Sequence, residues 1–235
     1  MVYITGDTHR NEFDRIEEFC EEYETTTDDV MVILGDAGIN FYGEPGDSEL
    51  KRELNDLPIT LLCIHGNHEK RPETIRTYDE EDRFGGVVYV ESEFPNLLFA
   101  KCGEIYELDD NRCLVIGGAN SIDKYQRIEG VNWWPDEQPS DYIKKRVEAR
   151  LEREKWRVEI VFSHTCPFNY LPREQFMSGV RQSLVDNSTE KWLQFIEERL
   201  EYSEWYCGHF HTDKYEHRFK FVFREIHELS DSLYI

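Results

Sequence analysis

The sequence has little of what marks membrane-spanning, secreted or disulfide-bonded proteins. It contains no run of about 18 apolar residues that would form a membrane-spanning helix. The start of the chain, Met1 to Asp7, has neither the basic region nor the long apolar region of a signal peptide. The six cysteines are scattered and form no CxxC pair. We therefore expect free thiols and a reducing, cytoplasmic compartment.

Positive charge is also scarce. The chain has 27 Lys and Arg against 49 Asp and Glu, which gives a formal net charge of −22. A surface this acidic repels polyanions, so the charge argues against nucleic acid as a partner. No membrane partner is expected, and the sequence identifies no protein partner. A soluble acidic protein accounts for most of the excess acid, and a small part of it could balance bound cations.

What is present is sufficient for a large hydrophobic core. The 235 residues are 39% hydrophobic, and no repeat, linker or low-complexity tract interrupts them. A chain of this length buries roughly 70–75% of its unfolded surface. We expect one domain that spans residues 1–235.

Five short apolar runs end in polar turns, and this pattern predicts a site. Each run has the length of a buried strand in a mostly parallel sheet. In open α/β sheets ligands bind just beyond the carboxyl ends of the strands, so we expect the turns to share one site. The turns are Gly6-Asp7-Thr8-His9, Gly35-Asp36, Gly66-Asn67-His68-Glu69, His164, and Gly208-His209-Phe210-His211.

The segments between these runs predict helices and a second set of strands. Helical spacing of apolar residues indicates helices over 12–24, 48–55, 140–156 and 189–202, with Asn11 and Ser140 as caps. Alternating patterns indicate antiparallel strand pairs within 87–116 and a β-hairpin over 214–229. Residues 70–83 are expected to form a weak helix or a loop. Residues 117–134 form a long loop, which is either functional or an ordered surface loop with its tryptophans against the core.

The polar turns carry donors typical of a two-metal site. In a strand or tight turn, residues i and i+2 face the same way, so Asp7 with His9 and His209 with His211 could each hold one ion. Carboxylate, imidazole and amide donors suit Mn²⁺ first, with Fe, Zn²⁺, Ni²⁺ or Mg²⁺ as alternatives. The candidate ligands are too many for one ion and suit two that share a carboxylate: Asp7, His9, Asp36, Asn67, His164, His209 and His211.

Each turn alone has a plainer explanation. A single Asp-x-His or Gly-Asp is usually a turn cap, and a single histidine at a strand end is usually hydrogen-bonded within the protein. His65, three residues before His68, is expected to be such a packed histidine. The prediction rests on the five turns occurring together and in this order.

The five turns resemble the calcineurin-like metallophosphoesterase superfamily, in its phage and bacterial type. Gly66-Asn67-His68-Glu69 is also shared with the serine/threonine protein phosphatases. The resemblance covers residues 6–211. It implies an α/β protein with a four-layer α/β/β/α sandwich, in which two mixed sheets are flanked by helices.

The resemblance also implies a ligand set and a reaction. One ion would be held by Asp7, His9, Asp36 and His211, and the other by Asp36, Asn67, His164 and His209. The reaction would be hydrolysis of a phosphomonoester or small phosphodiester by in-line attack of a metal-bridging hydroxide. His68 would be the general acid that protonates the leaving oxygen.

The residues after Asp36 depart from the protein phosphatases. The acidic partner of the general acid and the phosphate-binding arginine of that family are missing there. Arg10, Arg127, Arg173 or Arg181 could replace the arginine, although each alone is more simply a surface residue. Together with Asn67 and Asn120, Arg10 and Arg127 are our candidate substrate-binding residues.

Two alternatives remain beside the phosphoesterase. A nuclease of the same superfamily would need several phosphate-contacting cations, which the charge disfavours. A catalytically silent scaffold that binds a protein would retain the fold without activity. Such members lack some of the ligands, and none is missing here.

Overall fold

The computed structural model describes residues 1–10, 13–176 and 179–229. The α-helices in these ranges are α1 (Asp14–Tyr23), α2 (Gly46–Asn55), α3 (Asp141–Arg153) and α4 (Ser188–Glu197). Five single-turn 3₁₀ helices lie in the connections: η1 (Pro72–Thr74), η2 (Lys124–Gln126), η3 (Phe168–Tyr170), η4 (Arg173–Gln175) and η5 (Gln182–Leu184). None of the helices in the described ranges is both long and apolar enough to cross a bilayer.

The strands form two mixed sheets. The first has the order β13-β1-β2-β3-β6-β5-β4. Its strands are β1 (Val2–Thr5), β2 (Val30–Ile33), β3 (Thr60–Cys63), β4 (Asp79–Arg83), β5 (Gly86–Val90), β6 (Leu97–Ala100) and β13 (His227–Glu228). The second has the order β11-β12-β10-β9-β8-β7. Its strands are β7 (Ile105–Leu108), β8 (Asn111–Ile116), β9 (Ile160–Ser163), β10 (Glu204–Cys207), β11 (Lys214–Glu216) and β12 (Phe219–Phe221).

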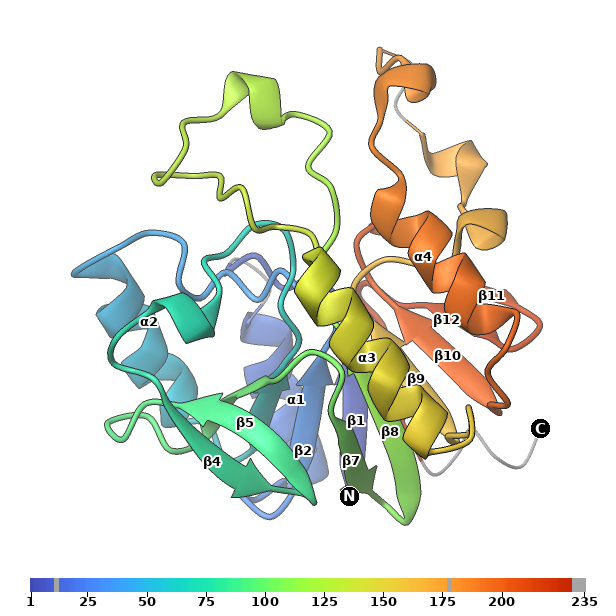
Figure 1. Cartoon of the computed structure of the whole chain (residues 1–235). Helices are drawn as coiled ribbons and strands as arrows, with labels where there is room; N and C mark the ends of the chain where they lie inside the picture. The colour runs from blue at the N-terminus through green and yellow to red at the C-terminus, as the bar shows by residue number, and fades with distance from the viewer. Residues whose placement is uncertain (11–12, 177–178, 230–235) are drawn as a thin grey trace.

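Alternating side chains on the central strands build three apolar layers. On β1, Val2 and Ile4 join a core between the two sheets that also contains Val115, Phe162 and other buried residues. Tyr3 points to the opposite face, where α1 and α2 cover the first sheet. On the second sheet, the outer face packs against α3 and α4. Because successive side chains of a strand point to opposite faces, uniformly apolar strands are buried on both sides. This confirms the predicted four-layer α/β/β/α sandwich (Figure 1).

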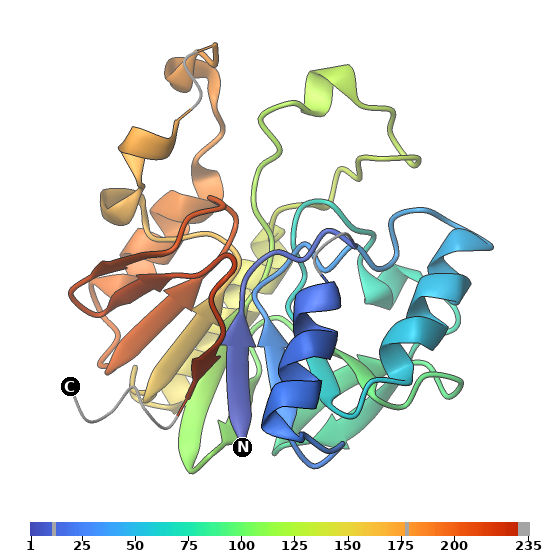
Figure 2. The same ribbon diagram turned by 180° about the vertical axis from the view of Figure 1, so that it is seen from behind.

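The parallel strands at the centre of each sheet set the position of the polar turns. β1, β2, β3 and β6 are parallel in the first sheet, and β8, β9, β10 and β12 are parallel in the second. Their carboxyl ends therefore lie at a common edge. Two long segments, 117–139 and the described part of 164–187 (residues 164–176 and 179–187), stand above this edge in both views (Figures 1 and 2).

The antiparallel strand pairs expected within residues 87–116 are present, and one strand of each pair also has a parallel neighbour on its other side. β5 pairs with β6 and β7 with β8 in antiparallel fashion, as predicted. β6 also pairs in parallel with β3, and β8 with β9, so the middle of the chain completes both sheets.

Four other predictions need correction. Within 70–83, where a helix or loop was expected, residues 79–83 form the edge strand β4, whose five side chains are all exposed. The hairpin over 214–229 contains only β11 and β12, and the chain then crosses to pair β13 with β1. Helix α4 ends at Glu197, well before residue 202. Helix α1 begins at Asp14, and the expected cap Asn11 lies outside the described residues.

The predicted cap of α3 is confirmed: Ser140 Oγ accepts a hydrogen bond from the Ile143 amide.

Candidate metal centre and active site

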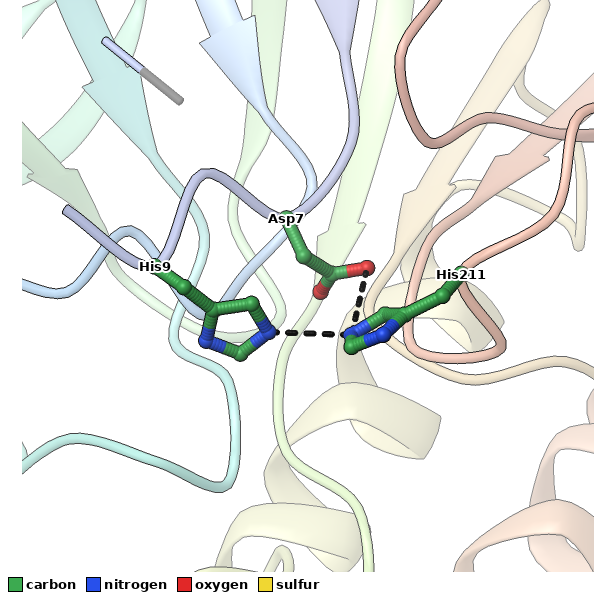
Figure 3. Close-up of side chains that lie close together, drawn as sticks. All are labelled: Asp7, His9 and His211. Carbon is green, nitrogen blue, oxygen red and sulfur yellow. Dashed lines mark hydrogen bonds and ion pairs between the residues drawn. The ribbon is translucent and has the colours of Figure 1, made fainter. Parts of the chain in front are cut away.

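One group of potential metal ligands brings together two turns that are about 200 residues apart in the sequence. Asp7 and His9 follow β1, and His211 follows β10 (Figure 3). The His9 and His211 Nε2 atoms lie 2.9 Å apart, and His211 Nε2 lies 4.0 Å from Asp7 Oδ2. One ligand atom from each of the three residues lies within 4.8 Å of the others. The residues that the sequence placed around one ion are therefore neighbours in the fold.

The second group lies beside the first and is more deeply buried. It consists of Asp36, His164 and His209. His164 Nε2 lies 3.6 Å from Asp36 Oδ2 and 2.9 Å from Asn67 Oδ1. Asn67 thereby points its carbonyl oxygen at the group.

Asp36 lies between the two groups. Its Oδ1 accepts hydrogen bonds of 2.8 Å from the backbone amides of Asn67 and His68. Its Oδ2 is 3.6 Å from His164 Nε2 and 4.0 Å from His9 Nε2. One oxygen of Asp36 is thus fixed by backbone amides, while the other faces imidazoles of both groups.

The turns reach this geometry through left-handed backbone. The φ angles of His9, Asp36, His209 and His211 are 44°, 48°, 67° and 49°. Such conformations cost of order 1–3 kcal/mol each for residues other than glycine, and they cluster at functional sites. Gly35 (φ 103°) allows a close approach, because a Cβ there would lie 2.1 Å from His164 Nδ1.

Burial and mutual charge shift the pKa values of these groups. Burial, followed by the charge of Asp36, holds the pKa of Asp7 well above its usual value. Burial acts against ionisation of Asp36 too, but the imidazoles of His164, His68 and His9 outweigh it and lower its pKa. Burial lowers the pKa of His9 to about 4 and also lowers those of His164 and His209. His9, His164 and His209 are therefore neutral at neutral pH, which is the form that binds metal.

The residues fit a pair of divalent cations. Asp7 is fully buried, and its Oδ1 has no hydrogen-bond partner among the described residues. An orphaned buried carboxylate oxygen costs about 1–3 kcal/mol or more, and a cation would remove that cost. The other donors are neutral imidazoles, a second carboxylate and an amide oxygen, which suit Mn²⁺, Fe or Zn²⁺.

His68 lies at the edge of both groups, beside an arginine. Its Nε2 is 3.9 Å from Asp36 Oδ2 and 3.5 Å from Arg127 Nη2. Asp123 holds Arg127 in a two-pronged ion pair, with Nε–Oδ1 and Nη2–Oδ2 distances of 2.8 and 2.7 Å. A cationic donor is thus oriented in advance next to the imidazole.

The other candidate substrate-binding residues are placed differently. The Arg10 guanidinium lies over the Tyr42 ring at 5.0 Å, and Arg10 borders a separate, smaller pocket of about 360 Å³ beside α1. Arg173 lies over the Phe168 ring and, like Arg181, is exposed. Asn120 lines the cavity above the candidate metal centre, where its Oδ1 accepts a hydrogen bond from Lys124. Of the four arginines considered, Arg127 alone borders that cavity.

Three residues that position the side chains of the site were not predicted from the sequence: Ser121, Asp123 and Glu137. Ser121 Oγ accepts a 2.9 Å hydrogen bond from Asn67 Nδ2, and this bond directs the Asn67 Oδ1 toward His164. Glu137 accepts hydrogen bonds from the Ser121 amide and from Trp133 Nε1, which closes the 117–139 segment. Asp123 orients Arg127. The i,i+4 spacing of Asp123 and Arg127 is the one signal that could have revealed this pair.

His65 has the packed position that was expected of it. It is buried, and its Nε2 lies 3.2 Å from the Glu69 carbonyl oxygen.

Trp133 and Trp134, in the long loop, are half-buried. Trp133 bonds Glu137 and Trp134 packs edge-on against Phe41.

The candidate metal centre opens into one large cavity of about 960 Å³. His9, Asp36, Asn67, His68, His209 and His211 line it, and residues of the segments 117–139 and 164–187 form walls. A pocket of this size and shape, with converging polar groups, is typical of a ligand site.

Comparison with known proteins agrees with this geometry. The sequence profile of the calcineurin-like phosphoesterase family matches residues 1–213. Among solved structures, the fold is similar to the crystal structure of TT1561 of Thermus thermophilus. The TM-score is 0.53 at 12% sequence identity, over 94% of this chain and 87% of that one. A search of curated protein sequences gave no match.

Fold and sequence thus define the class: this is a metallophosphoesterase-type α/β sandwich. The chain belongs to the calcineurin-like phosphoesterase family. The family makes it a metal-dependent phosphoesterase.

Proposed function

We propose that the protein is a dinuclear metal-dependent hydrolase of a phosphomonoester or small phosphodiester, with His68 as general acid. The observation that carries this proposal is the position of Asp36. Its Oδ2 lies 3.6 Å from His164 Nε2 and 4.0 Å from His9 Nε2, between the two donor groups. Metal centres with a shared carboxylate hold their ions about 3.5–4 Å apart, which suits both sides of an in-line displacement.

The proposed ligand sets follow the two groups. Asp7, His9, Asp36 and His211 would hold one ion, and Asp36, Asn67, His164 and His209 the other. Mn²⁺ is the first choice, since carboxylate and imidazole donors suit it, with Fe, Zn²⁺, Ni²⁺ and Mg²⁺ as alternatives. Two such ions would lower the pKa of a water molecule and neutralise charge on the phosphoryl oxygens.

The protein's own side chains have two further roles in the proposal. His68 holds the proton that the leaving oxygen receives, a role worth roughly 10²–10⁴-fold in rate. Arg127 lies 3.5 Å from His68 Nε2 and binds phosphoryl oxygens there. Asn120 and Asn67 complete the substrate contacts. Arg10 is a weaker candidate, because it contacts Tyr42 and does not border the cavity.

The proposal also covers the setting of the enzyme. We propose that residues 1–235 form a single domain. The six cysteines are all free and buried, which supports a cytoplasmic location. No observation favours the scaffold. The nuclease is disfavoured because Arg127 is the one Lys or Arg among the described residues that line the cavity.

The test compares two ester classes and two histidines. The protein is stripped of metal, reloaded with Mn²⁺, and assayed with an aryl phosphomonoester and the matching diester. His68→Asn should lower the rate by roughly 10²–10⁴-fold without loss of bound metal. His217→Asn, at an exposed turn between β11 and β12, is the matched control. A protein that binds two ions yet hydrolyses neither ester with any of the metals would refute the proposal.

A further inference from the structure

The walls of the cavity above the candidate metal centre are largely apolar. Its volume of about 960 Å³ is at the upper end of the range for small-molecule pockets, so a phosphoryl group leaves most of it unfilled. Apolar side chains come from four separate parts of the chain: Phe41, Ile122, Leu171, Phe176, Val185 and Phe210. The part of a substrate beyond its phosphoryl group therefore meets these apolar side chains, interspersed with the uncharged amides of Asn120, Gln126, Gln175, Gln182 and Asn187.

The same walls contain few positively charged groups that could bind a second anion. Arg127 is the one Lys or Arg of the described lining, and both prongs of its guanidinium pair with Asp123. Outside the candidate metal ligands, the remaining acidic residues of the described lining are Asp186 and Glu190, and burial raises the pKa of Glu190 to about 7. Hydrogen bonds from Gln138 and from the Ser188 amide support the charged form of Asp186. A second phosphate or carboxylate would thus lie next to the like charge of Asp186 without a free cation among the described wall residues to pair with it.

We infer that the cavity binds a phosphate ester whose alcohol part is apolar and carries no second anionic group. This inference rests on the proposed function, since it assigns the phosphoryl group to the metal centre. It favours alkyl and aryl phosphates, or their small diesters, over nucleoside polyphosphates, sugar bisphosphates and nucleic acid.

The test uses phosphonates, which cannot be hydrolysed, so that binding is measured apart from activity. The Mn²⁺-loaded protein is titrated calorimetrically with ethyl-, butyl- and hexylphosphonate. A buried methylene is worth about 0.8 kcal/mol, which is about fourfold in Kd. We expect each added methylene to tighten binding by up to about fourfold. Butane-1,4-diphosphonate should bind at least about tenfold more weakly than butylphosphonate, because its second anion lies against the acidic wall.

Two wall variants sharpen the test. Leu171→Ala removes apolar wall and should weaken hexylphosphonate more than ethylphosphonate. Gln182→Lys adds a cation to the lining and should tighten the diphosphonate by up to about fivefold, the worth of an exposed ion pair. Ser183→Lys is the control for added charge, because Ser183 is exposed but does not line the cavity.

The outcomes separate this inference from the proposed function. Affinity that is indifferent to chain length, or a diphosphonate that binds as tightly as butylphosphonate, would overturn the inference. If the phosphonates show the expected trend but no ester is hydrolysed, the inference stands and the proposed activity fails.

Discussion

Ser121 determines which atom of Asn67 faces the candidate metal centre. Its Oγ accepts a hydrogen bond from Asn67 Nδ2 at 2.9 Å, and the Asn67 Oδ1 then faces His164. Residues that orient a metal ligand typically contribute 10–100-fold to metal affinity. We expect Ser121→Ala to weaken Mn²⁺ binding by about 10–100-fold, measured by calorimetry on the metal-free protein.

Ser121→Thr is the matched control, because it keeps the hydroxyl group. It should retain affinity close to that of the wild type. Unchanged Mn²⁺ affinity in Ser121→Ala would show that the Asn67 amide needs no such support.

Glu190 makes the stability of the protein depend on pH. The side chain is 4% exposed, and burial raises its pKa from 4.5 to about 7. The folded protein thus binds this proton more tightly than the unfolded chain does. The stabilisation is fully present below about pH 4.5 and is lost as the pH rises through about 7. The shift corresponds to about 3 kcal/mol.

Glu190→Gln should remove this loss. Its free energy of unfolding, measured in urea and compared with that of the wild type, should gain on the order of 3 kcal/mol between pH 5 and pH 8.5. Glu152→Gln, at an exposed position on α3, should show no such gain. Parallel pH profiles for wild type and Glu190→Gln would contradict the prediction.

At the scale of elements, the ends of β2 and β9 meet at Gly35. A Cβ at this position would lie 2.1 Å from His164 Nδ1, and the φ of 103° is unfavourable for any other residue. We expect Gly35→Ala to displace the His164 ring, to weaken metal binding at least about tenfold, and to destabilise the fold by more than its backbone cost of about 1 kcal/mol. Metal titration and urea unfolding measure the two effects.

Gly43→Ala isolates the backbone cost. Gly43 also has a positive φ, of 68°, but a Cβ there would meet nothing within 4 Å. Equal losses of stability and metal affinity in the two variants would mean that the contact with His164 is unimportant.

The central strands and their turns could be predicted because they are extreme in composition. Residues 30–33 and 60–63 are buried along their whole length, so apolar runs mark them. Burying polar side chains directly after such runs costs free energy, so their presence there is unusual and marks a site in the sequence. β4 could not be found in this way, because Asp79–Arg83 is wholly exposed and gains its conformation from pairing with β5. β13 depends likewise on β1.

The sequence offered Arg127 as one of four candidate phosphate-binding arginines, but it could not show which of the four lies beside His68. Segment 117–139 has little regular structure, so periodicity gives no information about it. Its shape depends on individual contacts, such as those of Glu137 with Ser121 and Trp133. Such contacts place Arg127 at the cavity and leave Arg10 against Tyr42.

For the whole molecule, the shared core between the sheets predicts cooperative unfolding. One buried cluster contains Ile4 and Val32 from the first sheet and Val115 and Phe162 from the second. Neither sheet can lose its partner without exposing this layer to water. In urea with a chelator present, we expect far-UV circular dichroism and tryptophan fluorescence to report one coincident transition. Two separate midpoints would contradict a single domain over residues 1–235.

The His9–His211 contact spans 202 residues of sequence, and this separation has a consequence for biosynthesis. The ribosome must translate as far as residue 211 before both imidazoles exist, so a nascent chain cannot assemble the Asp7, His9 and His211 group before that point of elongation. Under the proposed ligand sets, a prematurely terminated product that ends before residue 209 would lack His211 at one ion and His209 at the other, and we expect it to be inactive.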